Sequence, residues 1–512
     1  MHRSTVRFLC VLTFLPALLL AGNPLVVPMT AEDLAAMESN TDRKLLVGVT
    51  KDLGAELNLS GLRPQDLRAT PSPAGFGHIQ RTADGFTWSG AIESPGATAM
   101  RLHFSNFFLP NNATITLSST AGDSFSYAGF GPAGTGEFWS NTLRGDRVEL
   151  TVTYSGNDLG RVLQALRFVV AEVGPLGPKF PVANPEAGNE LCGYNEPCVV
   201  NASCLSNPAV ATAQDAVAMI LFVSGAFQYI CSGGLVGDGS VPYFLTANHC
   251  LSREREADTL EAYFDFTTPC GSCDDGISDE PRTLGSAIVA ENGTSDFTLL
   301  RLDQAAPAGT AFLTPNPTPV ANSDGVALYR ISHPAGAPQA YSSQVVDTSR
   351  PTCSSWPRGN WIYSTDVEGA TEGGSSGSPV VNAAGEVVGQ LSGACGFNVN
   401  DPCDSVNNAT VDGALAAYWS QVEPFLGGGG GGCTDADGDG VCASEDCNDN
   451  NAAVFPGATE ACDGVDNDCD LQIDEGCSAG GCDLLPSDAS CSADSQCCSG
   501  NCKGKPGSQT CK

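Results

Sequence analysis

Positive charge is the scarcest feature of this 512-residue sequence. Lys and Arg total 24 residues against 58 Asp and Glu, which gives a formal net charge of -34. A nucleic-acid-binding protein needs a basic face to neutralise phosphates, so we expect no nucleic-acid partner. The acid is also concentrated, because residues 433–477 hold thirteen Asp or Glu and no Lys or Arg.

Long apolar runs are also missing. After residue 22 no segment reaches the roughly eighteen apolar residues of a membrane-spanning helix, so we expect no transmembrane segment. The start of the chain has basic residues at Arg3 and Arg7, then an apolar run that ends at Leu20 and is too short to span a bilayer. This pattern predicts a signal peptide over residues 1–22 and a secreted, extracellular protein.

Cysteine is absent between residues 22 and 191 and dense afterwards. Ten cysteines lie in 192–403, six in 433–477 and six in 482–511. Even counts predict that each block closes its own disulfide bonds in an oxidising compartment. Charged residues make up only 16% of the chain, whereas Gly (59) and Pro (32) are plentiful. This composition favours all-β domains with many turns.

Composition and patterning change along the chain and mark its domains. Residues 23–70 are polar and weakly patterned, whereas 75–172 alternate apolar with polar residues, which predicts a β-sandwich. We predict a signal peptide at 1–22, a region at 23–190 with the sandwich (75–172) and a Pro/Gly-rich linker, a strand-rich domain at 191–425, a poly-Gly linker at 426–432, an Asp/Cys-rich module at 433–477 and a cysteine-rich module at 482–512.

Three local sequences in the domain at 191–425 carry catalytic residue types. His249 follows an apolar strand, Asp296 opens another, and Ser376 lies in the glycine-rich segment Gly373–Pro379. A serine hydroxyl needs an imidazole to take its proton and a carboxylate to fix the imidazole's tautomer. Each segment alone is a weak signal. Together they occur in the order His, Asp, Ser that chymotrypsin-type proteases use, so we predict a Ser-His-Asp triad.

The segments around these residues, with Cys231-Ser-Gly-Gly-Leu-Val and Val388-Gly-Gln-Leu391, resemble bacterial lysyl endopeptidases of the trypsin-like superfamily. The resemblance implies a chymotrypsin-like double β-barrel, a serine endopeptidase acting on protein or peptide substrates, and oxyanion donors from the backbones of Gly374 and Ser376. It also implies a Cys231–Cys250 disulfide. The sandwich resembles the non-catalytic region that precedes such domains, which implies a removable pro-region at 23–190 and a zymogen.

Two departures from the family pattern concern activation and specificity. Ser375 precedes the nucleophile where zymogens activated by a new N-terminus have Asp, so we expect that ion-pair switch to be absent. Thr410 occupies the place of the lysine-reading Asp of lysyl endopeptidases. Asp404 and Asp412 lie nearby in sequence, but no motif assigns either to the S1 pocket, so the S1 preference stays open.

The Asp/Cys-rich module contains a calcium-loop pattern. Asp435, Asp437 and Asp439 stand at positions 1, 3 and 5, Gly440 at position 6 and Asp446 at position 12. Carboxylates in this spacing converge on one Ca²⁺ ion. The module also resembles Asp/Cys-rich metal-binding repeats of secreted bacterial proteins. The alternative is an acidic disulfide module that binds nothing specifically. We expect no cofactor for catalysis and calcium in this module.

The last six cysteines resemble those of a cystine-knot miniprotein. Six cysteines allow fifteen pairings, which spacing cannot resolve. The resemblance implies the pairs Cys482–Cys498, Cys491–Cys502 and Cys497–Cys511. This module could dock to a surface or substrate, or protect the C-terminus. A second class of function therefore competes with proteolysis: an extracellular calcium-binding adhesion or structural protein whose protease-like domain is inert or incidental.

Overall fold

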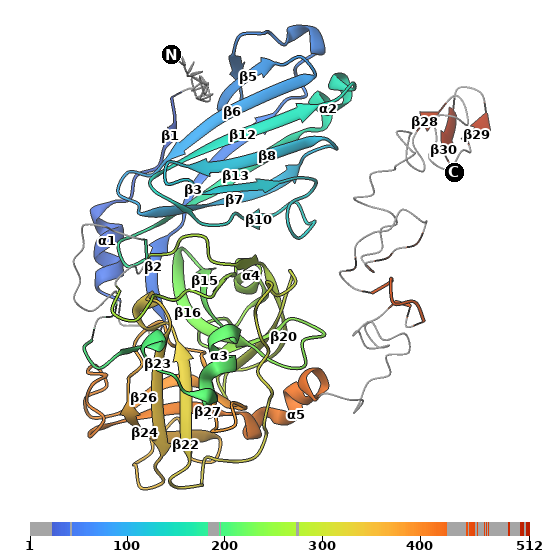
Figure 1. The fold of residues 1–512 in the computed structure, drawn as a ribbon. Helices are drawn as coiled ribbons and strands as arrows, with labels where there is room; N and C mark the ends of the chain where they lie inside the picture. The colour runs from blue at the N-terminus through green and yellow to red at the C-terminus, as the bar shows by residue number, and fades with distance from the viewer. Residues whose placement is uncertain are drawn as a thin grey trace, which may run out of the picture.

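The computed structural model describes residues 23–40, 44–182, 194, 196–272 and 276–427, with short stretches between 447 and 511. The protein is mainly β, as predicted: a sandwich lies at one end of the molecule and two barrel-like sheets lie at the other (Figure 1). None of the described helices is both long and apolar enough to span a membrane. The predicted signal peptide falls outside the described residues.

The helices are short and lie between strands. The α-helices are α1 (Ala31–Glu38), α2 (Leu159–Ala165), α3 (Ala211–Ala216), α4 (Glu254–Ala257) and α5 (Leu415–Leu426), and the 3-10 helices are η1 (Pro64–Asp66), η2 (Ala202–Cys204), η3 (Pro208–Val210) and η4 (Pro334–Gly336). Near the C-terminus β28 (Ser490–Cys491), β30 (Ser508–Cys511) and β29 (Cys502–Lys505) form a small sheet.

The sandwich packs two sheets over an aromatic core. Trp88 of one sheet meets Phe168 of the other edge to face, with ring centroids 5.8 Å apart. One sheet contains β4 (Ser72–Ala74), β5 (Gly77–Arg81), β6 (Gly85–Glu93), β12 (Arg147–Ser155), β8 (Ala113–Ser119), β9 (Ser124–Tyr127) and, beside β6, β1 (Leu25–Val26). The other contains β10 (Phe138–Trp139), β11 (Leu143–Arg144), β7 (Ala99–Phe108), β13 (Arg167–Leu176) and β3 (Lys51–Asn58).

Strands also form where the sequence is weakly patterned. β3 lies on the edge of the sandwich against β13, and β2 (Leu45–Val49) lies between the sandwich and the first barrel. The sandwich therefore begins well before residue 75. The physical reason is that β2 is an apolar run buried on both faces, so it has no alternation to reveal it.

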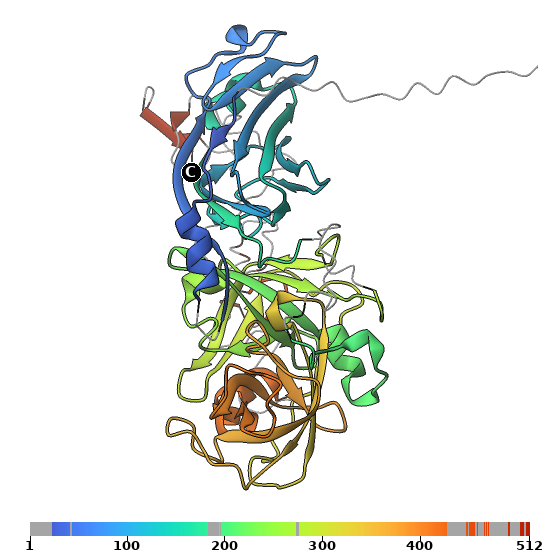
Figure 2. The same ribbon diagram turned by 90° about the vertical axis from the view of Figure 1, so that its left-hand side faces the viewer.

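β2 joins the sandwich and the first barrel into one continuous sheet. One edge of β2 pairs with β13, and the other pairs with the first half of β16 (Phe227–Leu235), with Val49 opposite Phe227 and Leu45 opposite Ile230. Figures 1 and 2 show β2 and α1 running along the junction. Because backbone hydrogen bonds cross this junction, the N-terminal region supplies a strand to the protease-like half.

The first barrel is a ring of strands around a large apolar core. Its strands are β16, β15 (Val217–Ser224), β18 (Glu261–Phe264), β19 (Arg282–Leu284), β20 (Ser286–Asn292), β21 (Phe297–Leu302) and β17 (Tyr243–Ala247). β19 and β20 are nearly continuous and turn at Gly285, whose φ of 75° suits glycine. β17 then pairs with β16 and β21, which closes the ring.

The second barrel closes through a pairing of β23 with β24. The ring contains β23 (Ala340–Val346), β22 (Ala327–Ser332), β25 (Pro379–Val381), β26 (Val387–Gly396), β27 (Asn408–Ala414) and β24 (Trp361–Glu368), and β14 (Val200–Asn201) adds to β23. Inside it Arg330 and Asp412 form an ion pair in which both side chains are fully buried. Helix α5 follows β27 directly.

A buried carboxylate holds the sandwich against the first barrel. Glu261 of β18 accepts hydrogen bonds from the backbone N–H and hydroxyl of Thr142, at 3.0 and 2.7 Å, and from the Asn141 amide. Arg101 of β7 lies 3.7 Å from the same carboxylate, and both side chains are fully buried. Removing one partner would leave a buried charge unsatisfied and would therefore destabilise the junction.

Candidate active site

His249 and Asp296 come from the first barrel. His249 follows β17, and Asp296 immediately precedes β21, the strand that pairs with β17. The Asp296 carboxylate accepts from the His249 backbone N–H through Oδ1 at 2.8 Å, and Oδ2 lies 2.8 Å from His249 Nδ1. Both side chains are at least 90% buried. This contact places the imidazole proton on Nδ1.

The other ring nitrogen of His249 is free to act as a base. His249 Nε2 is buried and has no hydrogen-bond partner among the described residues. With the proton held on Nδ1, the lone pair on Nε2 is available to accept a proton from a nucleophile.

Ser376 lies against the segment that carries His249. Ser232 of β16 donates its backbone N–H to the Ser376 carbonyl at 2.8 Å, and Cys250 Sγ lies 3.8 Å from that carbonyl oxygen. A disulfide joins Cys250 to Cys231, the residue before Ser232, and so ties together the two segments that contact Ser376. The structure therefore places the Ser376 backbone beside the segment that carries His249, and His249 against Asp296.

The turn around Ser376 depends on two glycines. Gly374 and Gly377 have φ values of 101° and 84°, in the region that favours glycine. A Cβ at Gly377 would lie 2.3 Å from Thr246 Oγ1, and one at Gly374 would lie 2.7 Å from the His333 carbonyl. Any side chain at either position would displace the loop that carries the nucleophile.

Two hydrogen bonds fix the orientation of the peptide groups before Ser376. The Gly373 carbonyl accepts from the Ala335 N–H at 2.7 Å, and the Gly374 carbonyl accepts from Ser232 Oγ at 2.8 Å. In a trans peptide the N–H points opposite to the C=O, so the Gly374 N–H points away from Ala335. Ser232 is a site residue that the sequence analysis missed, although it directly follows Cys231.

The residue before Ser376 forms a neutral contact. Ser375 is fully buried, and its hydroxyl lies 3.1 Å from that of Ser332. Nearby, burial lowers the pKa of His333 to about 4, so this imidazole is neutral near pH 7; it stacks on Phe266.

Three carboxylates bear on the S1 preference that the sequence left open, and their surroundings differ. Asp412 is committed to Arg330 inside the second barrel, and Asp404 lies in a surface loop where it accepts from Asn407 and Asn398. The Thr410 hydroxyl donates to Asp366 of β24 at 2.8 Å. Burial raises the pKa of Asp366 to about 6. A carboxyl group therefore lies one hydrogen bond away from the position where lysyl endopeptidases carry Asp.

Comparison with known proteins shows which family the barrel domains resemble. Residues 192–406 match the family model described as "Lysyl endopeptidase, C-terminal domain". This domain resembles that of a lysyl endopeptidase. A lysyl endopeptidase of Pseudomonas aeruginosa is 29% identical over 311 residues, which cover 58% of this chain and 64% of that protein. The chain thus aligns with just under two thirds of that relative's length.

Other similar proteins are more distant. The "Secreted RxLR effector protein 73" of Plasmopara viticola is 23% identical over 75% of this chain and 94% of its own length. An HtrA-type protease solved with a tripeptide has 18% identity and a TM-score of 0.32, covering 42% of this chain and 62% of that one. A protease from M. tuberculosis in its active form has 14% identity and a TM-score of 0.31, covering 47% of this chain and 94% of that one.

The Asp/Cys-rich module has its own match. Residues 446–475 match a family model named for copper binding and described as "Putative metal-binding motif". Within its described residues a disulfide joins Cys447 to Cys469, and Asn467 donates to the Ala453 carbonyl. The four predicted calcium ligands, Asp435, Asp437, Asp439 and Asp446, lie outside the described residues, and so do the side chains of the three predicted cystine-knot pairs.

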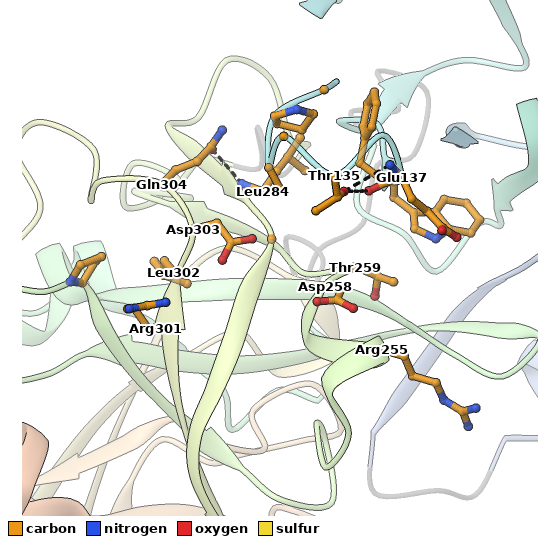
Figure 3. A pocket seen from close by; sticks show the side chains of 18 of the residues that line it. Thr135, Glu137, Arg255, Asp258, Thr259, Leu284, Arg301, Leu302, Asp303 and Gln304 are labelled. Atoms are coloured by element: carbon orange, nitrogen blue, oxygen red, sulfur yellow. Dashed lines mark hydrogen bonds between the residues drawn. The ribbon is translucent and has the colours of Figure 1, made fainter. Parts of the chain in front are cut away.

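A large cleft lies between the sandwich and the lysyl endopeptidase-like domain, and its lining includes Arg255 and Arg301 as well as several carboxylates. Glu137 projects from the sandwich side, and Asp258 and Asp303 project from the barrel side (Figure 3). Desolvation, together with the charges of Asp258 and Glu254, raises the pKa of Asp303 to about 6. Desolvation, Glu254 and Glu137 also raise the pKa of Asp258. The lining does not include the triad, so this cleft belongs to the junction between the two halves.

Proposed function

We propose that residues 191–425 form a serine endopeptidase domain that hydrolyses peptide bonds through Ser376, His249 and Asp296. The observation that supports this best is the double contact of one Asp296 carboxylate with the backbone N–H and Nδ1 of His249, beside a buried, unpartnered Nε2. A buried imidazole held in one tautomer next to a serine loop is the arrangement that general-base catalysis needs.

The proposed reaction follows from these groups. Ser376 Oγ attacks the substrate carbonyl carbon, its proton moves to His249 Nε2, and the carbonyl oxygen becomes an oxyanion. The Gly374 and Ser376 N–H groups donate to that oxygen. The C–N bond then breaks as His249 returns the proton to the leaving amine. Water, activated by the same imidazole, releases the acyl group from Ser376.

Covalent labelling tests this proposal directly. A fluorophosphonate probe should modify the native protein at Ser376, because the probe reacts only with a serine whose proton has an acceptor. Ser375→Ala and Ser378→Ala are matched controls from the same loop and should still be labelled. Absence of labelling in folded wild-type protein, measured by intact mass, would favour the alternative of an inert domain in an extracellular binding protein.

We further propose that the protein is secreted and matures by cleavage between the sandwich and the protease domain. The disulfides Cys198–Cys403 and Cys204–Cys270, with the predicted signal peptide, favour an oxidising compartment. We expect the mature N-terminus between Val182 and Cys192, because β13 runs to Leu176 and Phe180 is buried.

The cleaved N-terminal region is expected to stay bound to the protease domain. β2 pairs with β16 and Glu261 accepts from Thr142, and neither contact depends on an intact linker. Size-exclusion chromatography of processed protein at pH 5 should give one peak with both fragments, whereas Glu261→Ala should release the N-terminal fragment. Two separate peaks from processed wild-type protein at pH 5 would contradict this expectation.

The stability of the first barrel should fall as pH rises. Asp303 has a pKa of about 6, above its ordinary value, because of desolvation and the charges of Asp258 and Glu254 on its own barrel, so the folded state favours the protonated carboxyl. The resulting contribution is fully present below about pH 4 and is lost as pH rises through 6; Arg301 opposes part of it. Asp303→Asn should therefore reduce the difference in melting temperature between pH 5 and pH 8.

We propose separately that the Asp/Cys-rich module binds calcium, supported by the spacing of Asp435, Asp437 and Asp439. Calcium at a hundred times its Kd should stabilise the fold that it binds by about 2.7 kcal/mol. Calorimetric titration of the full chain should show Ca²⁺ binding and weaker Mg²⁺ binding, because Mg²⁺ requires tighter octahedral geometry.

The control for this titration is an Asp437→Asn/Asp439→Asn variant, which should lose the heat of binding. EDTA should leave peptide hydrolysis largely unchanged, since the triad requires no metal. Heat with Cu²⁺ but none with millimolar Ca²⁺ would assign the module to a different metal and contradict the calcium proposal.

A further inference from the structure

The backbone of Asp296 adopts an unusual conformation. Its φ is 54°, in the left-handed region that non-glycine residues rarely occupy. This conformation turns the chain just before β21 and directs the carboxylate toward His249. A sparsely populated conformation persists only when its surroundings hold it in place, so the contacts around Asp296 deserve their own explanation.

Gln390 binds the turn that carries Asp296. It lies on β26 of the second barrel and is fully buried. Its Nε2 donates to the carbonyls of Ser295 and Asp296, at 3.1 and 3.0 Å. One side chain from the second barrel thus reaches two consecutive carbonyls of the first barrel, on either side of the left-handed residue.

Tyr418 fixes the orientation of the Gln390 amide. The Tyr418 hydroxyl, on α5, donates to Gln390 Oε1, which leaves Nε2 to face the two carbonyls. The Tyr418 ring also stacks on Phe297, the residue after Asp296, with centroids 4.0 Å apart and planes 14° apart. Gly413, directly opposite Gln390 on β27, leaves room for the amide, since a Cβ there would lie 2.2 Å from Nε2.

We propose that Gln390 is a positioning residue that holds Asp296 in register with His249, and that Tyr418 keeps the Gln390 amide in its working orientation. The inference rests on the proposed peptidase function and adds a second support to the triad, from the second barrel and the C-terminal helix. It concerns alignment of the Asp296 carboxylate, not contact with substrate.

The test replaces Gln390 by Met, which keeps the length of the side chain and removes both hydrogen-bonding groups. Gln390→Met should lower kcat by tenfold or more, change KM by less than twofold, and move the acid limb of the pH–rate profile to lower pH. A less well aligned carboxylate stabilises the imidazolium less, which is the cause of that movement.

Gln228→Met is the matched control. Gln228 is also fully buried, and its amide also reaches two carbonyls, those of Val49 and Pro175, but at the sandwich junction. It should lose stability without moving the pH profile. Tyr418→Phe should give a smaller effect in the wild-type background and no further effect when Gln390 is already Met.

A spectroscopic readout separates this inference from the proposed function. In the Ser376→Ala background, the proton between His249 Nδ1 and Asp296 should give a downfield resonance that Gln390→Met shifts or broadens and Gln228→Met leaves in place. This measurement needs no turnover, so it reports on positioning even if the wild-type chain hydrolyses nothing. An unchanged resonance with unchanged kcat in folded Gln390→Met would overturn the proposal.

Discussion

Ser376→Ala is expected to lower kcat for peptide hydrolysis about 10⁶-fold while the fold and the melting temperature stay close to those of the wild type. The change removes one oxygen from a residue that is only 5% exposed, and the backbone contact of Ser376 with Ser232 is kept. Without the hydroxyl no acyl-enzyme can form, because His249 Nε2 has no nucleophile from which to accept a proton.

Kinetics with a peptide substrate would measure the loss of kcat, and circular dichroism would check that the fold is unchanged. Ser378→Ala is the internal control, because Ser378 is fully buried two residues away and its hydroxyl has no partner among the described residues. It should keep most of the activity. Residual hydrolysis by Ser376→Ala near the wild-type rate would mean that another residue is the nucleophile.

Asp296→Asn is expected to lower kcat near neutral pH by about 10⁴-fold. In the wild type, the Asp296 carboxylate accepts hydrogen bonds from both the backbone N–H and Nδ1 of His249. An amide presents N–H groups to one of these donors, so the imidazole must take the other tautomer, with its proton on Nε2. An Nε2 that carries a proton cannot accept the proton of Ser376.

The rate of fluorophosphonate labelling should fall in parallel with kcat, because both depend on the same proton transfer. Asp303→Asn makes the same chemical change in the cleft, outside the triad, and should leave kcat within about twofold. A loss of less than tenfold in Asp296→Asn, with the variant correctly folded, would remove Asp296 from the proposed triad.

The sequence predicted the mainly β class better than it predicted the junction between the two halves. His249, Asp296 and Ser376 could be grouped because each lies in a local pattern whose chemistry depends on its immediate neighbours. β2 could not be predicted as a shared strand, because its apolar residues satisfy a pairing with β16 that lies about 180 residues away in the sequence.

The residues that hold the site in place could not be predicted from the sequence for a related reason. Ser232 and Gln390 donate hydrogen bonds to backbone carbonyls of distant segments. Every residue has a backbone carbonyl, so the sequence does not indicate which one a side chain will contact. Asp412 illustrates the opposite case. Asp412 lies two residues after Thr410 and was therefore considered for the S1 pocket, yet the structure pairs it with Arg330 in the core of the second barrel.

The pairing of β2 with the first barrel has a consequence for how the protein folds during synthesis. The sandwich is synthesised first and presents β2 as a template edge on which β16 can add when it leaves the ribosome. A fragment that starts at residue 191 would expose the first half of β16 as an open edge, and open edges promote aggregation. The N-terminal region therefore belongs to the folding unit of the first barrel, and recombinant production should begin upstream of Leu45.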